Sequence, residues 1–337
     1  MDLYEAGLAE AATPGEGGWS LSAFLAVGAV LVAATLFGTT GTAQALGAEG
    51  ATPLGVGAVR LVIGGLGLLM VLPLVGGRRS EAIRLWRTPA GVAMGVCTAL
   101  YQVSFFAAVQ QAGVAIGTLA AIGSGPVLAG LLARFLLGER PRLSWVLATG
   151  LCLVGLTLLV TGGGGTRQVD LGGVALALLA GLSYAGYTVL AKGQLSAGHE
   201  PSTVMAAAFG LGGLLLVPLL VTQPTAWLLD PRGLATATHL GLVTTTLAYL
   251  LFARGLAELP AGPVTTLMLA EPVVATTLGV VVLDERLTLI STAGVGLLLL
   301  GLVLQGLGAA TGKRRERASR SDPASNDARE GSASTTT

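Results

Sequence analysis

The sequence predicts an all-α polytopic membrane protein, with ten transmembrane helices arranged as two inverted repeats of five and both termini in the cytoplasm. Three observations predict this class: the composition, ten separate apolar runs, and a self-similarity that spans about half the chain. Hydrophobic residues make up 53% of the 337 residues, charged residues only 11%, and the mean hydropathy is +0.77. A soluble protein of that composition would lack the polar residues to cover its surface, so most of the chain is expected in lipid.

Apolar windows of about 19 residues, ended by charged residues, polar runs or Pro/Gly clusters, define the ten spans. They are expected at Leu21–Ala43, Pro53–Val75, Thr88–Val109, Ala112–Leu136, Leu143–Thr161, Leu171–Leu190, Thr203–Val221, Leu234–Phe252, Gly262–Leu283 and Thr288–Leu307. Only Gln110, Gln111 and a nearby glycine separate the third span from the fourth, so a nine-span alternative stays open at this point.

The segments outside the spans are predicted from charge and composition. Residues 1–20 carry four acidic residues and no Lys or Arg, which differs from the positive start of a cleaved secretory signal, so they are expected to form a disordered tail. Residues 309–337 are basic and then rich in Ser, Thr, Asp and Ala, and they are also expected to form a disordered tail. A regulatory contact of this tail with anionic headgroups is the less favoured alternative.

Orientation follows from the Lys and Arg residues between the spans. With the amino terminus inside, the cytoplasmic segments contain Arg78, Arg79, Arg84, Arg87, Arg140, Arg142, Lys192, Arg254, Lys313, Arg314, Arg315, Arg317, Arg320 and Arg329. The outer loops then contain only Arg167, Arg232 and Arg286. This positive-inside bias predicts that both termini face the cytoplasm. An even number of spans agrees with it, because it places both termini on the same side of the membrane.

The chain resembles itself at a shift of 146 residues. Thr98 then aligns with Thr244, Phe106 with Phe252, Pro126 with Pro272, Glu139 with Glu285, and Arg140 with Arg286. Matches of Ala, Leu and Gly carry little weight in so biased a composition, but Pro, Phe and the Glu-Arg pair are scarce enough to indicate a duplication.

The duplication divides the chain into two copies. They are expected at residues 21–161 and 171–308, with a glycine-rich linker at 162–170. Because each copy has five spans, an odd number, the second copy must enter the membrane in the opposite orientation. Inverted repeats are typical of alternating-access carriers, whose substrate site lies near the midplane where the copies meet. A membrane scaffold or enzyme that arose by duplication is the alternative.

Three stretches give the chain a family resemblance. They are TLFGTTGTA at Thr35–Ala43, GTLAAIGSGPVLAGLLARFLLGERP at Gly117–Pro141, and the stretch Thr244–Thr288 that contains AEPVVATTLGVVVLDERLT. In these stretches the chain resembles the EamA-type transporters of the drug/metabolite transporter superfamily. The resemblance covers nearly the whole chain apart from the tails. It implies ten helices in two EamA-like units, residence in the cytoplasmic membrane, and transport of small metabolites, commonly the efflux of amino acids or related compounds. It does not define the substrate.

Glu271 is the leading candidate for transport chemistry. It lies about nine residues into the ninth span, which places it ~13 Å into a hydrocarbon layer ~30 Å thick. An acid at that depth costs roughly 2.5 to 3.5 kcal/mol and needs a partner, a water-filled cavity or a proton. We therefore expect Glu271 either to take up and release a proton or to contact a substrate ammonium group. A structural acid beside Pro272 is the alternative, and the first copy has Gly125 at the equivalent position.

Other polar and aromatic residues in the apolar runs are candidates for the same pocket. Arg60, eight residues into the second span, could pair with Glu271, meet a substrate carboxylate or extend to the membrane surface. The aromatic and amide candidates are Tyr101, Gln102, Tyr184, Tyr187 and Tyr249. Tyr184 and Tyr187 are three residues apart and share a helix face. For each of these residues, packing against a neighbouring helix is the competing interpretation.

Pro126 and Pro272 are the candidate hinges. Each removes one helical hydrogen bond, and they occupy matching positions in the two copies. The glycine run at Gly162–Gly165 is followed by no Lys-Ser/Thr and so is not a phosphate-binding loop. His199 and His239 are isolated in the sequence, and no basic, aromatic face for nucleic acid is present.

The sequence therefore predicts a multi-pass secondary transporter, not an enzyme, that needs no cofactor or metal. Its expected partners are a small organic substrate, the lipid bilayer and, through Glu271, protons, with no nucleic acid. Export of amino acids or related compounds is favoured. The alternatives are a membrane-embedded scaffold or enzyme without transport activity, and an efflux carrier for drugs or nucleosides.

Overall fold

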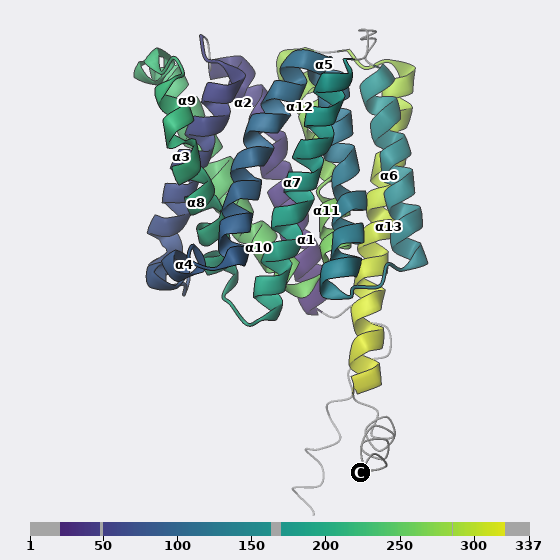
Figure 1. The fold of residues 1–337 in the computed structure, drawn as a ribbon. Helices are drawn as coiled ribbons and strands as arrows, with labels where there is room; N and C mark the ends of the chain where they lie inside the picture. The colour runs from purple at the N-terminus through teal and green to yellow at the C-terminus, as the bar shows by residue number, and fades with distance from the viewer. Residues whose placement is uncertain (1–20, 48–49, 163–169, 285, 321–337) are drawn as a thin grey trace, which may run out of the picture.

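The protein is a bundle of helices in a computed structural model that describes residues 21–47, 50–162, 170–284 and 286–320 (Figure 1). Within those residues every regular element is helical. The elements are α1 (Leu21–Gly38), α2 (Thr40–Gly47), α3 (Pro53–Val71), η1 (Leu72–Leu74), α4 (Arg79–Leu85), α5 (Pro89–Leu137), α6 (Leu143–Gly162), α7 (Leu171–Ser196), α8 (Pro201–Val221), η2 (Ala226–Leu229), α9 (Pro231–Thr238), η3 (His239–Leu247), α10 (Ala248–Glu258), α11 (Ala261–Leu267), α12 (Ala270–Leu283) and α13 (Leu289–Arg320).

In the described part of the chain, ten helical segments are long and apolar enough to cross a membrane. They are Leu21–Gly47, Pro53–Leu74, Pro89–Gly113, Ile116–Leu137, Leu143–Gly162, Leu171–Ser196, Pro201–Val221, Pro231–Glu258, Ala261–Leu283 and Leu289–Ala309. Each predicted span has its counterpart among these ten. The start of α1 and the end of α13 lie at the same end of the bundle, as an even number of crossings requires (Figure 1).

The boundary between the third and fourth spans lies inside α5. Gly113 has φ 85° and ψ 160°, values that no helical residue adopts, and there the chain turns back without a connecting loop. Glycine tolerates this backbone conformation because it lacks a Cβ atom. The ten-span prediction is therefore correct, and the nine-span alternative is wrong.

The two repeats meet through equivalent contacts in α6 and α13. Gly155 lies against the backbone of Gly294 and Leu298, leaving no room for a side chain. Gly301 lies in the same way against the backbone of Ala148 and Cys152. Each contact maps onto the other by the shift of 146 residues found in the sequence. Such exchanged contacts are the signature of a twofold relation, here between two halves of one chain.

The duplicated corner has the same backbone conformation in both copies. Gly138 ends α5 with φ 68°, and Asp284, 146 residues later, ends α12 with φ 54°. Asp284 is the one residue other than glycine with positive φ in the described ranges. Asp occupies this left-handed region more readily than most residues, because its short side chain can bond locally.

The eighth and ninth spans, in the second repeat, depart from the helical geometry of the third and fourth spans, their equivalents in the first. The eighth span contains a π-helical turn, η3, where Thr245 and Thr246 donate hydrogen bonds to carbonyl groups five residues earlier. The ninth span is interrupted at Met268 and Leu269, between α11 and α12. Pro272 follows the break at once, and its ring and missing N–H prevent a regular helical bond to residue 268.

The carboxyl-terminal helix differs from expectation. The segment from 309 was predicted to be disordered, but α13 continues through the basic residues to Arg320. Lys and Arg residues favour helix and interact well with the negative end of the helix dipole, which explains the extension. The predicted tail at 1–20, most of the linker at 162–170 and residues 321–337 lie outside the described residues.

Candidate functional site

The predicted site residues converge in the interior of the bundle from five helices. Arg60 lies on α3, Tyr101 and Gln102 on α5, Tyr184 and Tyr187 on α7, Tyr249 on α10, and Glu271 on α12. The first three come from the first repeat and the other four from the second. The candidate site therefore draws on both repeats, as predicted from the duplication.

Arg60 is held in the interior by the π-helical turn of the eighth span. Its Nε donates a hydrogen bond of 3.1 Å to the Thr245 hydroxyl, and its Nη2 donates one of 3.4 Å to the Thr244 carbonyl. The guanidinium carbon lies 5.5 Å from the centre of the Phe37 ring, within the range of a cation–π interaction. Arg60 is therefore fixed toward the other repeat and does not extend to the membrane surface.

Aromatic rings form a continuous wall around Arg60. Tyr249 lies 3.8 Å from Phe209 and 4.9 Å from Phe37, measured between ring centres. The Tyr187 hydroxyl donates a 3.4 Å hydrogen bond to the Tyr249 hydroxyl. Tyr184 packs edge-on against Tyr187 at 5.5 Å, which confirms that the two residues share a helix face. Aromatic packing of this kind stiffens the wall and leaves the hydroxyl groups as its polar edge.

The remaining wall is polar but tightly packed. Gln102 is buried and donates a 3.4 Å hydrogen bond to the Gly57 carbonyl, and the Thr98 hydroxyl bonds to the carbonyl groups of Gly95 and Ala208. These residues and the aromatic wall surround a cavity of about 10 Å³, which has room for roughly one water molecule. A metabolite could occupy the site only after the helices move apart.

Glu271 lies in the first turn of α12, immediately after the break in the ninth span. Its N–H donates a 3.0 Å hydrogen bond to the Met268 carbonyl. Its carboxylate makes no hydrogen bond or ion pair with any described residue. Arg60 and the hydroxyl groups of Tyr101 and Tyr249 nevertheless lie within its electrostatic reach. The pairing of Arg60 with Glu271, one of the alternatives for Arg60, is therefore not formed among the described residues.

The structure explains why Glu271 has no counterpart in the first repeat. A Cβ atom added to Gly125 would lie 2.9 Å from the Tyr184 ring, so Tyr184 occupies the space of a side chain at that position. At the shift of 146 residues, Gly38 in the first span is equivalent to Tyr184. Gly38 packs on Val274 and on the Glu271 carbonyl in the ninth span. One contact therefore pairs a large Tyr184 with Gly125, and the equivalent contact pairs Gly38 with the larger Glu271.

The two candidate hinge prolines have different surroundings. Pro126 lies inside the continuous helix of the fourth span, whereas Pro272 lies three residues into α12, next to the break. The histidines are not isolated in space as they are in the sequence. His199 Nδ1 lies 2.9 Å from a Glu81 oxygen, and His239 Nε2 lies 2.8 Å from the Thr39 hydroxyl. No metal-binding cluster of His, Cys, Asp or Glu occurs in the described residues.

Sequence reasoning missed four residues of the site. Phe37, Thr98, Phe209 and Thr245 line it or hold Arg60, yet each was indistinguishable in the sequence from an ordinary packing residue. Thr245 belongs to a run of three threonines, Thr244–Thr246, and the hydroxyl groups of all three donate to carbonyl groups of their own helix. A run of threonines in a sequence favours an irregular helix, but it does not predict that this helix contacts Arg60.

Comparisons with known proteins cover most of the chain, apart from its ends. Residues 24–161 and 171–306 each match the EamA-like transporter family. A Bacillus subtilis protein named uncharacterized transporter YwfM is 43% identical over 275 residues, which cover 82% of this chain and 91% of that protein. The threonine/homoserine exporter RhtA of Escherichia coli K12 is 31% identical over 248 residues, covering 72% and 78%. A solved crystal structure has the same fold, with a TM-score of 0.71 at 23% identity, over 84% of this chain and 97% of that one.

Proposed function

The chain belongs to the EamA-like transporter family, and from this premise we propose that it exports amino acids or related small metabolites across the cytoplasmic membrane by alternating access. Membership supports a multi-pass transporter rather than an enzyme. We propose four further points: the substrate class, the direction of transport, the cytoplasmic position of both termini, and coupling to protons.

One observation carries the substrate class. Arg60 lines the aromatic-walled cavity, and Glu271 lies within its electrostatic reach without forming an ion pair with it. A guanidinium group binds carboxylates with well-defined geometry, and a carboxylate binds ammonium groups. An α-amino acid carries both groups, so it complements both charges. The name of the relative RhtA, a threonine/homoserine exporter, supports the same class.

Glu271 is also the proposed coupling residue. A carboxylate without a protein partner near mid-membrane is costly in its charged form, so a proton or a substrate ammonium group must neutralise it. If the two compete for Glu271, substrate release on one side and proton uptake are linked. The sequence carries no nucleotide-binding motif, which is consistent with energy from an ion gradient.

The break in the ninth span supports alternating access. α12 begins in the interior with Glu271 in its first turn, and discontinuous helices of this kind surround the substrate sites of inverted-repeat carriers. The cavity at Arg60 has room for roughly one water molecule, so this conformation corresponds to a closed state in the proposed cycle. Rocking of one repeat against the other would open it to each side in turn.

The proposal is tested by transport in proteoliposomes. The full chain is reconstituted, and uptake of radiolabelled L-threonine and L-homoserine is measured under an imposed proton gradient. The wild type is expected to accumulate at least one of them. Arg60→Met should lower uptake about 100-fold, because a charge-assisted contact of roughly 3 kcal/mol is lost.

Arg84→Met is the matched control, since Arg84 lies exposed on α4, away from the site. It should transport like the wild type. Uptake by Arg60→Met at the wild-type level would contradict the carboxylate contact. Absence of uptake of both amino acids by a well-folded wild type would contradict the substrate class.

An efflux carrier for aromatic cations is the second candidate function. The observation that favours it is the ring wall of Phe37, Tyr187, Phe209 and Tyr249, because aromatic faces attract organic cations. Competition separates the two candidates. Tetraphenylphosphonium should leave threonine uptake unchanged if the site is built for amino acids, and it should block uptake if the site takes aromatic cations.

A further inference from the structure

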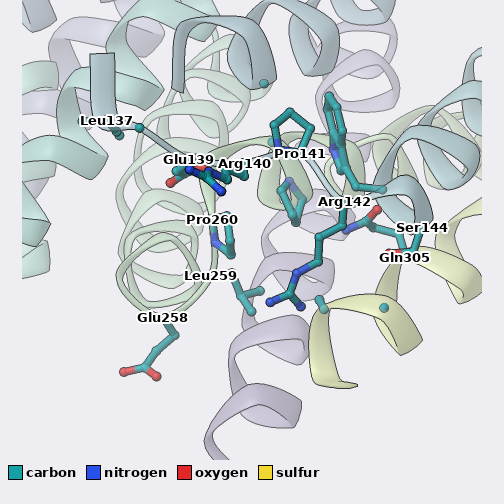
Figure 2. A pocket seen from close by; sticks show the side chains of 17 residues that line it. Leu137, Glu139, Arg140, Pro141, Arg142, Ser144, Glu258, Leu259, Pro260 and Gln305 are labelled. Atoms are coloured by element: carbon teal, nitrogen blue, oxygen red, sulfur yellow. The ribbon is translucent and has the colours of Figure 1, made fainter. Parts of the chain in front are cut away.

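A large cavity lies at the end of the bundle where Gly138–Arg142 connects α5 to α6 (Figure 2). Its volume is about 610 Å³, within the range of cavities that hold small molecules. α5, α6, α11 and α13 line it, together with residues 138–142 and 258–260. It shares no lining residue with the small cavity at Arg60. The large cavity, here called the vestibule, is therefore a separate space.

Gln305 on α13 marks a place in the vestibule that a ligand could occupy. Gln305 lines the cavity and is only 3% exposed, yet its Oε1 atom has no hydrogen-bond partner among the described residues. A buried acceptor without a donor is costly in free energy, so a group that donates an N–H to it would gain binding energy. The equivalent residue of the first repeat is Leu159, so a polar side chain at this depth is not a requirement of the fold.

The charges of the vestibule suit a ligand that bears both signs. Arg140 and Arg142 line it, and Figure 2 shows Arg142 directing its guanidinium group toward Leu259. The Glu258 carboxylate points away from the other labelled side chains in the same view. Glu139 contributes a negative charge, and its oxygens accept the Ala261 N–H at 3.2 and 3.4 Å. Burial raises the pKa of the Glu139 carboxyl, although Lys192 and the Ala261 N–H oppose the effect.

Trp145 connects the vestibule to the ninth span. Its ring lies directly against Gly130 and Gly262, and its Nε1 donates a 3.1 Å hydrogen bond to the Thr266 hydroxyl. Thr266 lies on α11, next to the break that precedes Glu271. Glu139 accepts the N–H of the first residue of α11, and Trp145 donates to Thr266 near its last. Gly262 and Pro263 of the same half-helix line the cavity, so the vestibule and the break are connected through α11.

We propose that the vestibule is a second binding site for a small zwitterion with an ammonium and a carboxylate group. Arg140 and Arg142 bind the carboxylate, while Gln305 Oε1 and Glu139 accept hydrogen bonds from the ammonium group. This inference rests on the proposed function, since the ligand is the same amino acid that Arg60 and Glu271 bind deeper in the bundle. The vestibule is then where that substrate first binds when it arrives from this end.

Equilibrium binding of radiolabelled L-threonine to the purified full chain in detergent tests the proposal. The wild type should bind two molecules per chain. Gln305→Leu, which copies the first repeat, should weaken one class of sites about tenfold by removing a hydrogen-bond acceptor. Ser144→Trp, which fills the cavity from its exposed rim, should abolish the same class. Arg60→Met should weaken only the other class.

The outcomes separate the two proposals. Two sites that both respond to Arg60→Met and ignore Gln305→Leu and Ser144→Trp would overturn the vestibule but leave the proposed function. A site lost in Gln305→Leu, without any site sensitive to Arg60→Met, would support the vestibule and contradict the proposed midplane site. A wild type that binds a single molecule, at a site insensitive to Gln305→Leu, would overturn the vestibule directly.

A lipid headgroup is the competing source of the same chemistry, because phosphatidylethanolamine carries an ammonium and a phosphate. Binding is therefore repeated in nanodiscs of phosphatidylcholine with and without phosphatidylethanolamine. The Gln305-sensitive class should bind threonine equally in both. Its loss in the presence of phosphatidylethanolamine would overturn the assignment to a soluble amino acid.

Discussion

The fourth and ninth spans are copies of one another, and they differ at the point where transport chemistry is proposed. In the fourth span Gly125 and Pro126 lie within a continuous helix. In the ninth span Glu271 and Pro272 follow a break between α11 and α12. The same contrast holds one span earlier, where the eighth span contains a π-helical turn. The second copy has thus given up helical regularity where it acquired a carboxylate.

The difference shows how a duplicated fold can become chemically asymmetric. Tyr184 fills the space beside Gly125, whereas Gly38 leaves room for the backbone at Glu271. Each copy still supplies part of the site, since Arg60 comes from the first and Glu271 from the second. The two charges are therefore divided between the two halves, which move relative to one another in the proposed mechanism.

The largest expected effect comes from giving the first copy the acid of the second. Gly125→Glu would force a Cβ atom to within 2.9 Å of Tyr184 and would bury a charge. Overpacking and membrane burial of an acid together cost about 4 to 6 kcal/mol. We expect a large fall in the melting temperature of the purified protein, with partial recovery when Tyr184→Ala is added. If Gly125→Glu melted at the same temperature as the wild type, the packing of Tyr184 would not explain why the first copy lacks the acid.

A smaller effect is expected from the π-helical turn. Thr245→Val removes the 3.1 Å hydrogen bond to Arg60 Nε, and a bond to a charged group is worth roughly 1.5 kcal/mol or more. The KM for the transported amino acid should rise about tenfold with little change in kcat. Thr245→Ser keeps the hydroxyl group and should behave like the wild type. Equal KM values for the Val and Ser variants would show that the turn does not position Arg60.

Replacing the two prolines should affect the transport rate differently, because Pro272 follows a break in its span and Pro126 lies in a continuous helix. Pro272→Ala restores an N–H that can bond to residue 268 and so favours a continuous ninth span, which should slow transport several-fold. Pro126→Ala changes a span that is already continuous, so its transport rate should stay close to that of the wild type. Similar slowing by both variants would mean that the break has no special role.

The smallest effect is expected at Glu139, whose pKa is raised from its usual value of 4.5 by burial. Its stabilising contribution is full below that usual value and is lost as pH rises through the raised pKa, because the folded protein disfavours the charged form. Glu139→Gln removes this loss and can still accept the Ala261 N–H. Its melting temperature relative to the wild type should therefore increase from pH 4 to neutral pH. If the melting temperature of Glu139→Gln relative to the wild type fell as pH rose, the raised pKa of Glu139 would be contradicted.

Much of the fold was predictable because lipid imposes simple rules on sequence. Ten apolar runs, the basic segments and the 146-residue shift predicted the spans and the duplication, and residues such as Arg60 and Glu271 stood out as polar in apolar surroundings. The interaction of Arg60 with the Thr244 carbonyl was not predictable, because it depends on a π-helical turn in a distant span. Gln305 was overlooked, although it is an amide in an apolar run and is as deeply buried as Gln102.

The central claim is that coupling depends on one carboxylate, in the second copy only. Glu271→Gln should therefore lose accumulation of L-threonine driven by a proton gradient while it still exchanges internal for external threonine at equal pH. Asp284→Asn, at the far end of the same helix, should keep both activities. Gradient-driven accumulation by Glu271→Gln at the wild-type level would contradict the claim, because coupling would then depend on some other group.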